Sequence, residues 1–191
     1  GCSLGGRVVT DSSDNIYIGG MSRTLGTANG SNDNAIFKIA DNGTLTWVKQ
    51  TGTSSADETY HIDALNDSNF YFTGFRSINP SNWLLGKISS SNSIAWEKTK
   101  SGCKPSRGLT IDSSENIYVS GSTGCMISKY NSSGTEIWVK NITSSTTSSV
   151  DTAINSQGIL YVIGTTSESL DGLSYSNRRL FIWNVGNISS L

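Results

Sequence analysis

The chain has 191 residues, a net charge of −1, 15% charged residues and 35% hydrophobic residues. The near-neutral charge gives no electrostatic footprint for nucleic acid or for an anionic membrane surface. The composition also excludes a highly charged disordered chain, and no apolar run is long enough to span a bilayer. Abundant Ser, Thr, Asn and Gly with few charges are typical of a single all-β domain with many turns.

The first residues, Gly1-Cys2-Ser3, are compatible with a lipid anchor. In bacterial lipoproteins a small residue precedes a cysteine that is lipidated and becomes the mature N-terminus. Lipidation of Cys2 is therefore one interpretation, and a cloning remnant at Gly1 is the other.

The next stretch, DSSDNIYIGG from Asp11 to Gly20, returns almost unchanged as DSSENIYVSG from Asp112 to Gly121. Its alternating apolar and polar residues predict a strand that follows a tight turn. Alignment on its tyrosine reveals two further copies, so the marker occurs at Tyr17, Tyr71, Tyr118 and Tyr161.

A second marker follows each of the first three tyrosines in a fixed order. It consists of an apolar strand ending in Lys, a polar turn, and a strand carrying Trp. The lysines are Lys38, Lys87 and Lys129, and the tryptophans are Trp47, Trp96 and Trp138. The fourth unit ends in RLFIWNVGNISSL, which has no such lysine and no complete Trp strand, so we expect it to be degenerate or truncated.

Each unit contains four candidate antiparallel strands within about 40–50 residues, which is the spacing of a propeller blade. Neighbouring blades must cover each other, and the repeated aromatic residues would fill the space between them. We therefore predict one β-propeller domain over residues 1–191, either a closed ring of four blades or part of a larger propeller. The approximate blades are 6–50, 51–100, 101–140 and 141–191.

These motifs resemble the SBBP-type β-propeller repeat family of bacterial secreted and surface proteins. That repeat carries Asp-x-x-Gly-Asn-Ile-Tyr-Val-x-Gly, then an apolar strand ending in Lys, then Gly-x-x-x-Trp. The chain departs at the usual turn glycine, which is replaced by Asp14 and Glu115 but present as Gly158. The resemblance implies blades and a secreted or surface setting, and it implies no catalytic residue, because the family motif is structural.

The acidic turns allow two interpretations. Asp11 with Asp14, and Asp112 with Glu115, could supply oxygen ligands to Ca²⁺. A five-residue turn offers only two carboxylates, however, so we favour the alternative that Asp11 and Asp112 cap the hairpins. We therefore expect no metal and no cofactor.

His61 is the only histidine, and Asp57, Glu58 and Asp63 lie close to it in the sequence. Because strand alternation places neighbours on opposite faces, and because no nucleophile stands out, we expect no catalytic role for it. Trp83 and Tyr175 fall outside the aromatic markers and are the better candidates for exposed contacts.

Two further cysteines, Cys103 and Cys125, belong to the same repeat unit. They could form a disulfide or remain two separate thiols, and the spacing of the three cysteines is not that of a zinc site.

Taken together, these features favour a non-catalytic module, secreted or on the bacterial cell surface, that binds an unidentified protein or glycan or acts as a scaffold. One alternative is a fragment of a propeller enzyme, either a quinoprotein-like oxidoreductase or a lyase. Another is a self-assembling structural protein that pairs through exposed blade edges.

Overall fold

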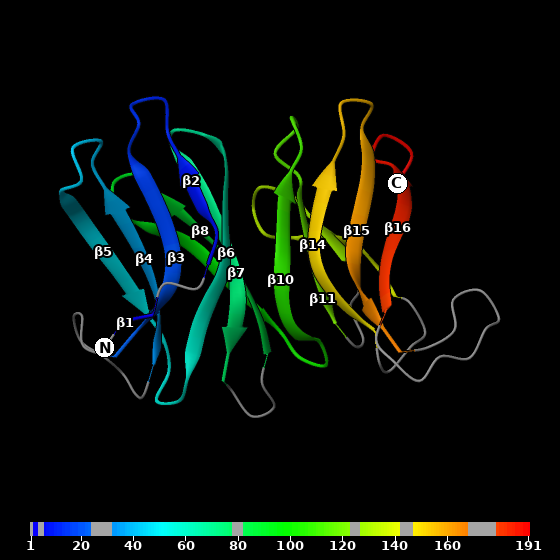
Figure 1. Ribbon diagram of the computed structural model, residues 1–191, viewed down its shortest axis with the longest axis horizontal. Helices are drawn as coiled ribbons and strands as arrows, with labels where there is room; N and C mark the ends of the chain where they lie inside the picture. The colour runs from blue at the N-terminus through cyan, green and yellow to red at the C-terminus, as the bar shows by residue number, and fades with distance from the viewer. Residues whose placement is uncertain are drawn as a thin grey trace.

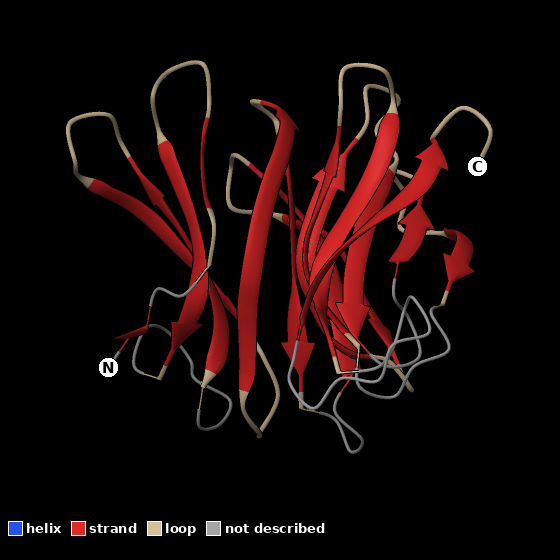
Figure 2. Ribbon diagram, turned by 45° about the vertical axis from the view of Figure 1, so that its right-hand side comes forward, coloured by secondary structure: helices blue, strands red, loops and turns tan. Residues whose placement is uncertain are grey.

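A computed structural model describes residues 2–3, 6–23, 32–77, 82–122, 127–141, 147–167 and 179–191. Over these residues the chain consists of strands joined by turns and loops, with no helix (Figure 2). Accordingly, no described helix meets the length and hydropathy required to cross a bilayer. The all-β fold class expected from the composition is confirmed.

Each of the first three blades contains four antiparallel strands that are consecutive in the chain. Blades 3 and 4 are joined into one seven-stranded sheet, because Ser122 of blade 3 pairs with Ser148 of blade 4. Blade 1 comprises β2 (Val8–Thr10), β3 (Ile16–Ser22), β4 (Asp33–Ile39) and β5 (Leu45–Thr51), and β1 (Cys2–Ser3) pairs with the end of β3. Blade 2 comprises β6 (Asp57–Asn66), β7 (Asn69–Arg76), β8 (Asn82–Ser89) and β9 (Ile94–Lys100). Blade 3 comprises β10 (Lys104–Ile111), β11 (Ile117–Ser122), β12 (Ile127–Tyr130) and β13 (Glu136–Lys140).

Blade 4 contains three strands among the described residues: β14 (Ser148–Ile154), β15 (Ile159–Thr166) and β16 (Arg179–Asn187). The four blades lie in a row, with the first and the fourth at opposite ends (Figure 1). We call the first strand of each blade its inner strand; the inner strands are β2, β6, β10 and β14. The inner strand β6 contacts β2 and β10, and β10 contacts β14.

The core is divided into three hydrophobic clusters, one at each junction between successive blades. At the first junction Tyr17 stacks on Phe70 with ring centroids 3.8 Å apart. The marker tyrosines of the first three blades are fully buried in these clusters, as expected for aromatic side chains that fill the space between sheets.

The recurrent lysines lie over the recurrent tyrosines. Lys38 Nζ is 5.1 Å from the Tyr17 ring centroid, Lys87 Nζ is 5.1 Å from that of Tyr71, and Lys129 Nζ is 5.3 Å from that of Tyr118. Each pair is directly opposed in the antiparallel register of the second and third strands. A cation–π contact therefore accounts for the Tyr and Lys positions in the repeat.

Candidate functional site

The inner strands bring four polar residues together, one from each blade. Arg7 lies just before β2, His61 is in β6, Arg107 is in β10 and Asp151 is in β14. We call these four residues the inner-strand cluster.

Three of these four residues occupy equivalent positions in the repeat, and the fourth is displaced by one residue. The residue opposite the marker tyrosine on each inner strand is Val9, Asp63, Thr110 or Ala153. Arg7, His61 and Asp151 each lie two residues before that position. Arg107 comes one residue earlier than this, at an irregularity in the β10–β11 ladder between Lys104 and Gly108.

His61 is the centre of the cluster and is only 3% exposed. Its Nδ1 is 3.0 Å from the carbonyl oxygen of Arg107, and its Nε2 is 3.4 Å from Nη1 of Arg7. A guanidinium can only donate, so Nε2 accepts and Nδ1 carries the proton that is donated to Arg107. Asp151 holds Oδ1 at 3.8 Å from Nδ1 of His61, and its Oδ2 accepts from Arg7 at 3.4 Å.

The electrostatics keep His61 neutral. Burial is the main cause that lowers the pKa of His61 below its ordinary value of 6.5, and the Arg7 charge acts in the same direction. The hydrogen bond to Arg107 and the Asp151 carboxylate oppose this shift without reversing it. A neutral imidazole with a lone pair on Nε2 is a competent general base.

Two carboxyl groups of the same strand, those of Asp63 and Glu58, have pKa values above their ordinary values. Burial raises the pKa of Asp63, and Asp151 adds to this while Arg7 opposes it. Burial also raises the pKa of Glu58, against the Arg107 charge. Raised carboxyl pKa values beside a neutral histidine form the pattern of an acid–base site.

Tyr60 completes this side of β6. The Arg107 guanidinium lies 5.1 Å from its ring centroid, and burial raises the pKa of its hydroxyl. The contact fixes the exposed guanidinium of Arg107 on Tyr60, so this member of the cluster places a cationic group at the edge of the site.

From the sequence we expected no catalytic role for His61, and we considered as its partners only carboxyl groups of its own strand. Asp57 is adjacent in sequence, yet its carboxylate accepts from the backbone of Thr53 and Ser77. The charged partners of His61 come instead from blades 1 and 4. One signal was available in the sequence. Arg7, His61 and Asp151 stand at the same position of their repeat units, and all three are polar and ionisable.

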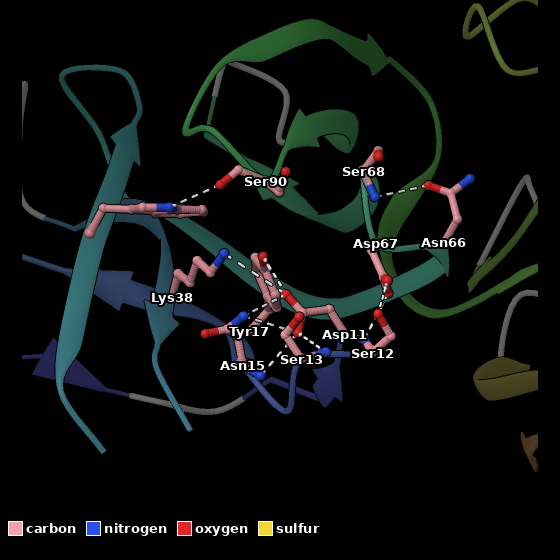
Figure 3. Close-up of polar contacts among 11 residues, drawn as sticks. Asp11, Ser12, Ser13, Asn15, Tyr17, Lys38, Asn66, Asp67, Ser68 and Ser90 are labelled. Atoms are coloured by element: carbon pink, nitrogen blue, oxygen red, sulfur yellow. Dashed lines mark hydrogen bonds and ion pairs between the residues drawn. The ribbon is translucent and has the colours of Figure 1, made fainter. Parts of the chain in front are cut away.

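Asp11 caps its turn, as favoured from the sequence (Figure 3), and Asp112 accepts the equivalent hydrogen bonds from Ser114, Asn116 and Tyr118. Asp11 Oδ1 accepts from the backbone nitrogens of Ser13 and Asn15 at 3.0 Å, and Oδ2 accepts from the Tyr17 hydroxyl at 3.1 Å. Burial raises the pKa of Asp11, but these hydrogen bonds outweigh it and leave the pKa lowered. Among the described residues, no three His, Cys, Asp or Glu side chains are grouped so that they could hold a metal ion.

Trp83 is not an exposed contact residue, so that expectation was wrong. It is 1% exposed, and its indole nitrogen donates to the Thr73 hydroxyl at 3.1 Å. It lies at the base of a groove of about 270 Å³ between blades 2 and 3, which is also lined by Tyr130, Lys100 and Glu136. Tyr175 lies outside the described residues.

The tryptophan markers bridge successive blades. The indole nitrogens of Trp47, Trp96 and Trp138 donate to the carbonyl oxygens of Ser90, Ser132 and Leu191, respectively, at 3.1–3.2 Å. Tyr161, the marker of blade 4, is only partly buried.

Cys103 is buried and disulfide-bonded. Cys125 lies outside the described residues, as does the side chain of Cys2, so the pairing of Cys103 with Cys125 and the lipidation of Cys2 remain predictions.

No family model matches the chain, and no curated protein matches its sequence. Solved structures do match. One is a luciferin-regenerating enzyme, with 18% identity, a TM-score of 0.56, and coverage of 94% of this chain and 61% of that one. A streptogramin B lyase matches with 13% identity, a TM-score of 0.58, and coverage of 95% and 55%. A protein of unknown function from Bacteroides caccae matches with 10% identity, a TM-score of 0.57, and coverage of 94% and 61%.

The expectation that the chain is not an enzyme is contradicted by this comparison, because the fold it shares includes named enzymes. The expectation rested on the structural character of the repeat motif and on the lack of an obvious nucleophile, but the structure gathers several charged side chains around His61. The chain spans at most about three-fifths of the length of these structures. The resemblance to SBBP-type repeats holds at the level of the propeller, and no family model supports that particular family. The chain is therefore an all-β protein with propeller blades.

Proposed function

We propose that the chain is part of a propeller enzyme whose inner-strand cluster catalyses proton transfer, with the chemistry of a lyase. The observation that carries the proposal is the convergence of the only histidine with Arg7, Arg107 and Asp151, each from a different blade. A site built from four strands or strand ends, three of its residues at equivalent repeat positions, with a neutral base beside cations, suits acid–base catalysis.

The proposed roles follow from the hydrogen bonds. His61 takes, on Nε2, a proton from a carbon next to a carbonyl group of the substrate. Arg7, whose Nη1 donates to Nε2 at 3.4 Å in this structure, exchanges that hydrogen bond for one to the carbonyl oxygen when the substrate binds. The exchange frees the Nε2 lone pair and stabilises the negative charge that develops on the oxygen. The electron pair of the broken C–H bond forms a C=C bond as the C–O bond to the leaving group breaks, and the imidazolium returns its proton to the leaving oxygen.

Asp151 is a positioning residue in this scheme. Its carboxylate lies 3.8 Å from Nδ1, on the opposite side of the ring from the nitrogen that takes the proton. It therefore stabilises the imidazolium while the proton is held on His61. The streptogramin B lyase among the matching structures is consistent with this reaction class.

The proposal is tested by offering the purified chain streptogramin B and a panel of cyclic and linear esters with an acidic C–H beside the carbonyl. Absorbance of the new conjugated C=C bond reports elimination. In a His61→Asn variant the amide can still donate to the Arg107 carbonyl but provides no base, so we expect kcat/KM to fall by about 10²–10⁴-fold. Ile137→Ala, an exposed change in blade 3, should leave kcat/KM unchanged. Wild-type activity in His61→Asn, or no elimination from any substrate, contradicts the proposal.

We also propose that the protein works in an oxidising compartment, as a secreted or surface protein. The disulfide at Cys103 supports this, because such bonds persist mainly outside the cytosol. Peptide mapping of the unreduced protein from its native host should find a peptide containing Cys103 linked to one containing Cys125. A free thiol at Cys103 in that material contradicts the proposal.

A further inference from the structure

Arg107 is the member of the inner-strand cluster whose side chain has no part in the proposed proton transfer. Its guanidinium is exposed and lies 5.1 Å from the centroid of the Tyr60 ring. Among the residues that the structure describes, it forms no ion pair and donates no side-chain hydrogen bond. Its N–H donors are therefore available to a ligand beside the cluster.

Irregular strand pairing places this guanidinium next to His61. The inner strands β6, β10 and β14 lie side by side in this order (Figure 1), and each has a break in its register at the same level of the repeat. The breaks lie between Thr59 and His61, between Lys104 and Gly108, and between Ser149 and Asp151. Such bulges redirect side chains and are common beside active sites. In β6 the extra residue is Tyr60, so Tyr60 and His61 both reach β10, one at the Arg107 guanidinium and the other at the Arg107 carbonyl oxygen.

Gly108 explains why blade 3 contributes Arg107 to the cluster. In β10 this glycine stands at the position that His61 and Asp151 hold in β6 and β14. A Cβ atom on Gly108 would lie 2.4 Å from Ser120 Oγ and 2.7 Å from Asp151 Cα, so a side chain does not fit there. The Asp151 backbone lies against the glycine, which lets its carboxylate reach His61 across β10. Blade 3 therefore presents its charge from the preceding residue, Arg107.

We propose that the substrate carries a carboxylate group and that the exposed guanidinium of Arg107 binds it beside His61. The inference rests on the proposed function, because it takes the inner-strand cluster as the substrate site. A guanidinium presents parallel N–H donors that match the two oxygens of a carboxylate. Stacking on Tyr60 holds the guanidinium in place, so less side-chain freedom is lost on binding. The carboxylate is separate from the carbonyl that Arg7 binds, so the substrate class is an ester or lactone that also carries a free acid.

The charges around the arginines favour a carboxylate over a phosphate. Three carboxyl groups lie within electrostatic reach of Arg7 or Arg107, namely those of Glu58, Asp63 and Asp151. A phosphate group carries about two negative charges at neutral pH, whereas a carboxylate carries a single one. The repulsion from the protein's own carboxyl groups is therefore smaller for a carboxylate.

A matched pair of unreactive esters tests the carboxylate. Monomethyl succinate and dimethyl succinate each have a C–H beside an ester carbonyl, and neither has an oxygen leaving group on the next carbon, so neither undergoes elimination. They differ in that the dimethyl ester lacks the free carboxylate. Titration of each into the protein is followed on the imidazole resonances of His61, which is the only histidine. We expect the monomethyl ester to bind about 10–100-fold more tightly, as for a charge-assisted hydrogen-bonded pair.

Substitution of Arg107 identifies the group that reads the carboxylate. Arg107→Gln should abolish the difference between the two esters, since it removes the guanidinium but keeps the backbone carbonyl that accepts from His61. Lys140→Gln is the matched control, because Lys140 also places a cation over a ring, with Nζ 5.4 Å from the Trp138 centroid, but in β13. It should keep the full difference. For eliminated esters that bear a carboxylate, Arg107→Gln should raise KM about 10–100-fold and leave kcat close to that of wild type.

Equal binding of the two succinate esters to wild type overturns the inference, and this comparison needs no variant. A difference that persists in Arg107→Gln, or that is lost in Lys140→Gln, overturns it as well. Tighter binding of methyl 3-phosphonopropanoate than of monomethyl succinate contradicts the assignment to a carboxylate. Elimination from neutral esters without a preference for the free acid refutes this inference alone, whereas carboxylate binding at Arg107 without elimination from any substrate refutes the catalytic proposal alone.

Discussion

The indole nitrogen of Trp47 donates a hydrogen bond at 3.2 Å to the carbonyl oxygen of Ser90, which lies in the turn between the last two strands of the following blade. The same contact recurs from Trp96 to Ser132 and from Trp138 to Leu191. Each of the first three blades is therefore attached to the next by a polar contact at its outer strand as well as by an apolar cluster.

Replacing Trp96 with Phe removes the donor to Ser132 while keeping an aromatic ring in the junction. We expect the free energy of unfolding to fall by about 1–2 kcal/mol, because a partly buried carbonyl loses its partner. Urea denaturation followed by fluorescence and circular dichroism measures the change. Ile137→Ala, which breaks no junction, should cost much less, and equal losses in the two variants would contradict this role for the indole.

The turn residues Asp14 and Glu115 occupy equivalent positions and have positive φ angles of 60° and 61°, where blade 4 has Gly158. Asp14 is exposed and has no side-chain partner among the described residues, so Asp14→Gly should stabilise the protein by about 0.5–1 kcal/mol through relief of backbone strain. Glu115 accepts from the Tyr71 hydroxyl at 2.5 Å and from Lys87 at 3.1 Å. Glu115→Gly should therefore be neutral or destabilising. Thermal unfolding of both variants decides this, and equal shifts would contradict it.

Asp112 links stability to pH. Burial raises its pKa, but hydrogen bonds from Asn116, Tyr118 and Ser114 outweigh burial and lower the pKa below the ordinary value of 3.8. A carboxyl group with a lowered folded-state pKa stabilises the fold above its unfolded pKa and loses this contribution as the pH falls through the folded value. Asp112→Asn should thus be less stable than wild type at neutral pH, and the difference should shrink below 3.8. A difference that is independent of pH would contradict this.

Two neighbouring charges shift the pKa of His61 in opposite directions. Its pKa is held below 6.5 chiefly by burial, with Arg7 lowering it further and Asp151 raising it. Arg7→Gln should therefore raise the pKa of His61, and Asp151→Asn should lower it. Because the chain has only one histidine, one set of imidazole resonances reports the titration by NMR without interference.

The same variants should move the rate profile. The neutral imidazole is the proposed base, so kcat/KM should fall only as the pH drops below 6.5 and through the lowered pKa of His61. The acidic limb should shift to higher pH in Arg7→Gln and to lower pH in Asp151→Asn. Shifts in the same direction would show that charge at these positions does not control His61.

The blades could be predicted from the sequence because their determinants are local and repeated. Tyr17 and Lys38 form a cross-strand pair within one blade, and the repeat makes that pairing visible three times over. The cluster around His61 could not be predicted in the same way. Its partners Arg7 and Asp151 come from other blades, and an irregularity in β6 between Thr59 and His61 changes which side chains point to the next inner strand. A low total charge also gave no hint of where the few charges gather.

The indole contacts between blades all point forward along the chain, and this has a consequence for synthesis on the ribosome. A blade that has just emerged lacks both the carbonyl that will accept its tryptophan and the sheet that will bury its tyrosine. Each blade therefore reaches its full stability only after about one more repeat has been translated. During synthesis the most recently completed blade therefore exposes one apolar face that its successor has yet to cover. A chaperone that binds the face of a single blade would protect the chain throughout elongation.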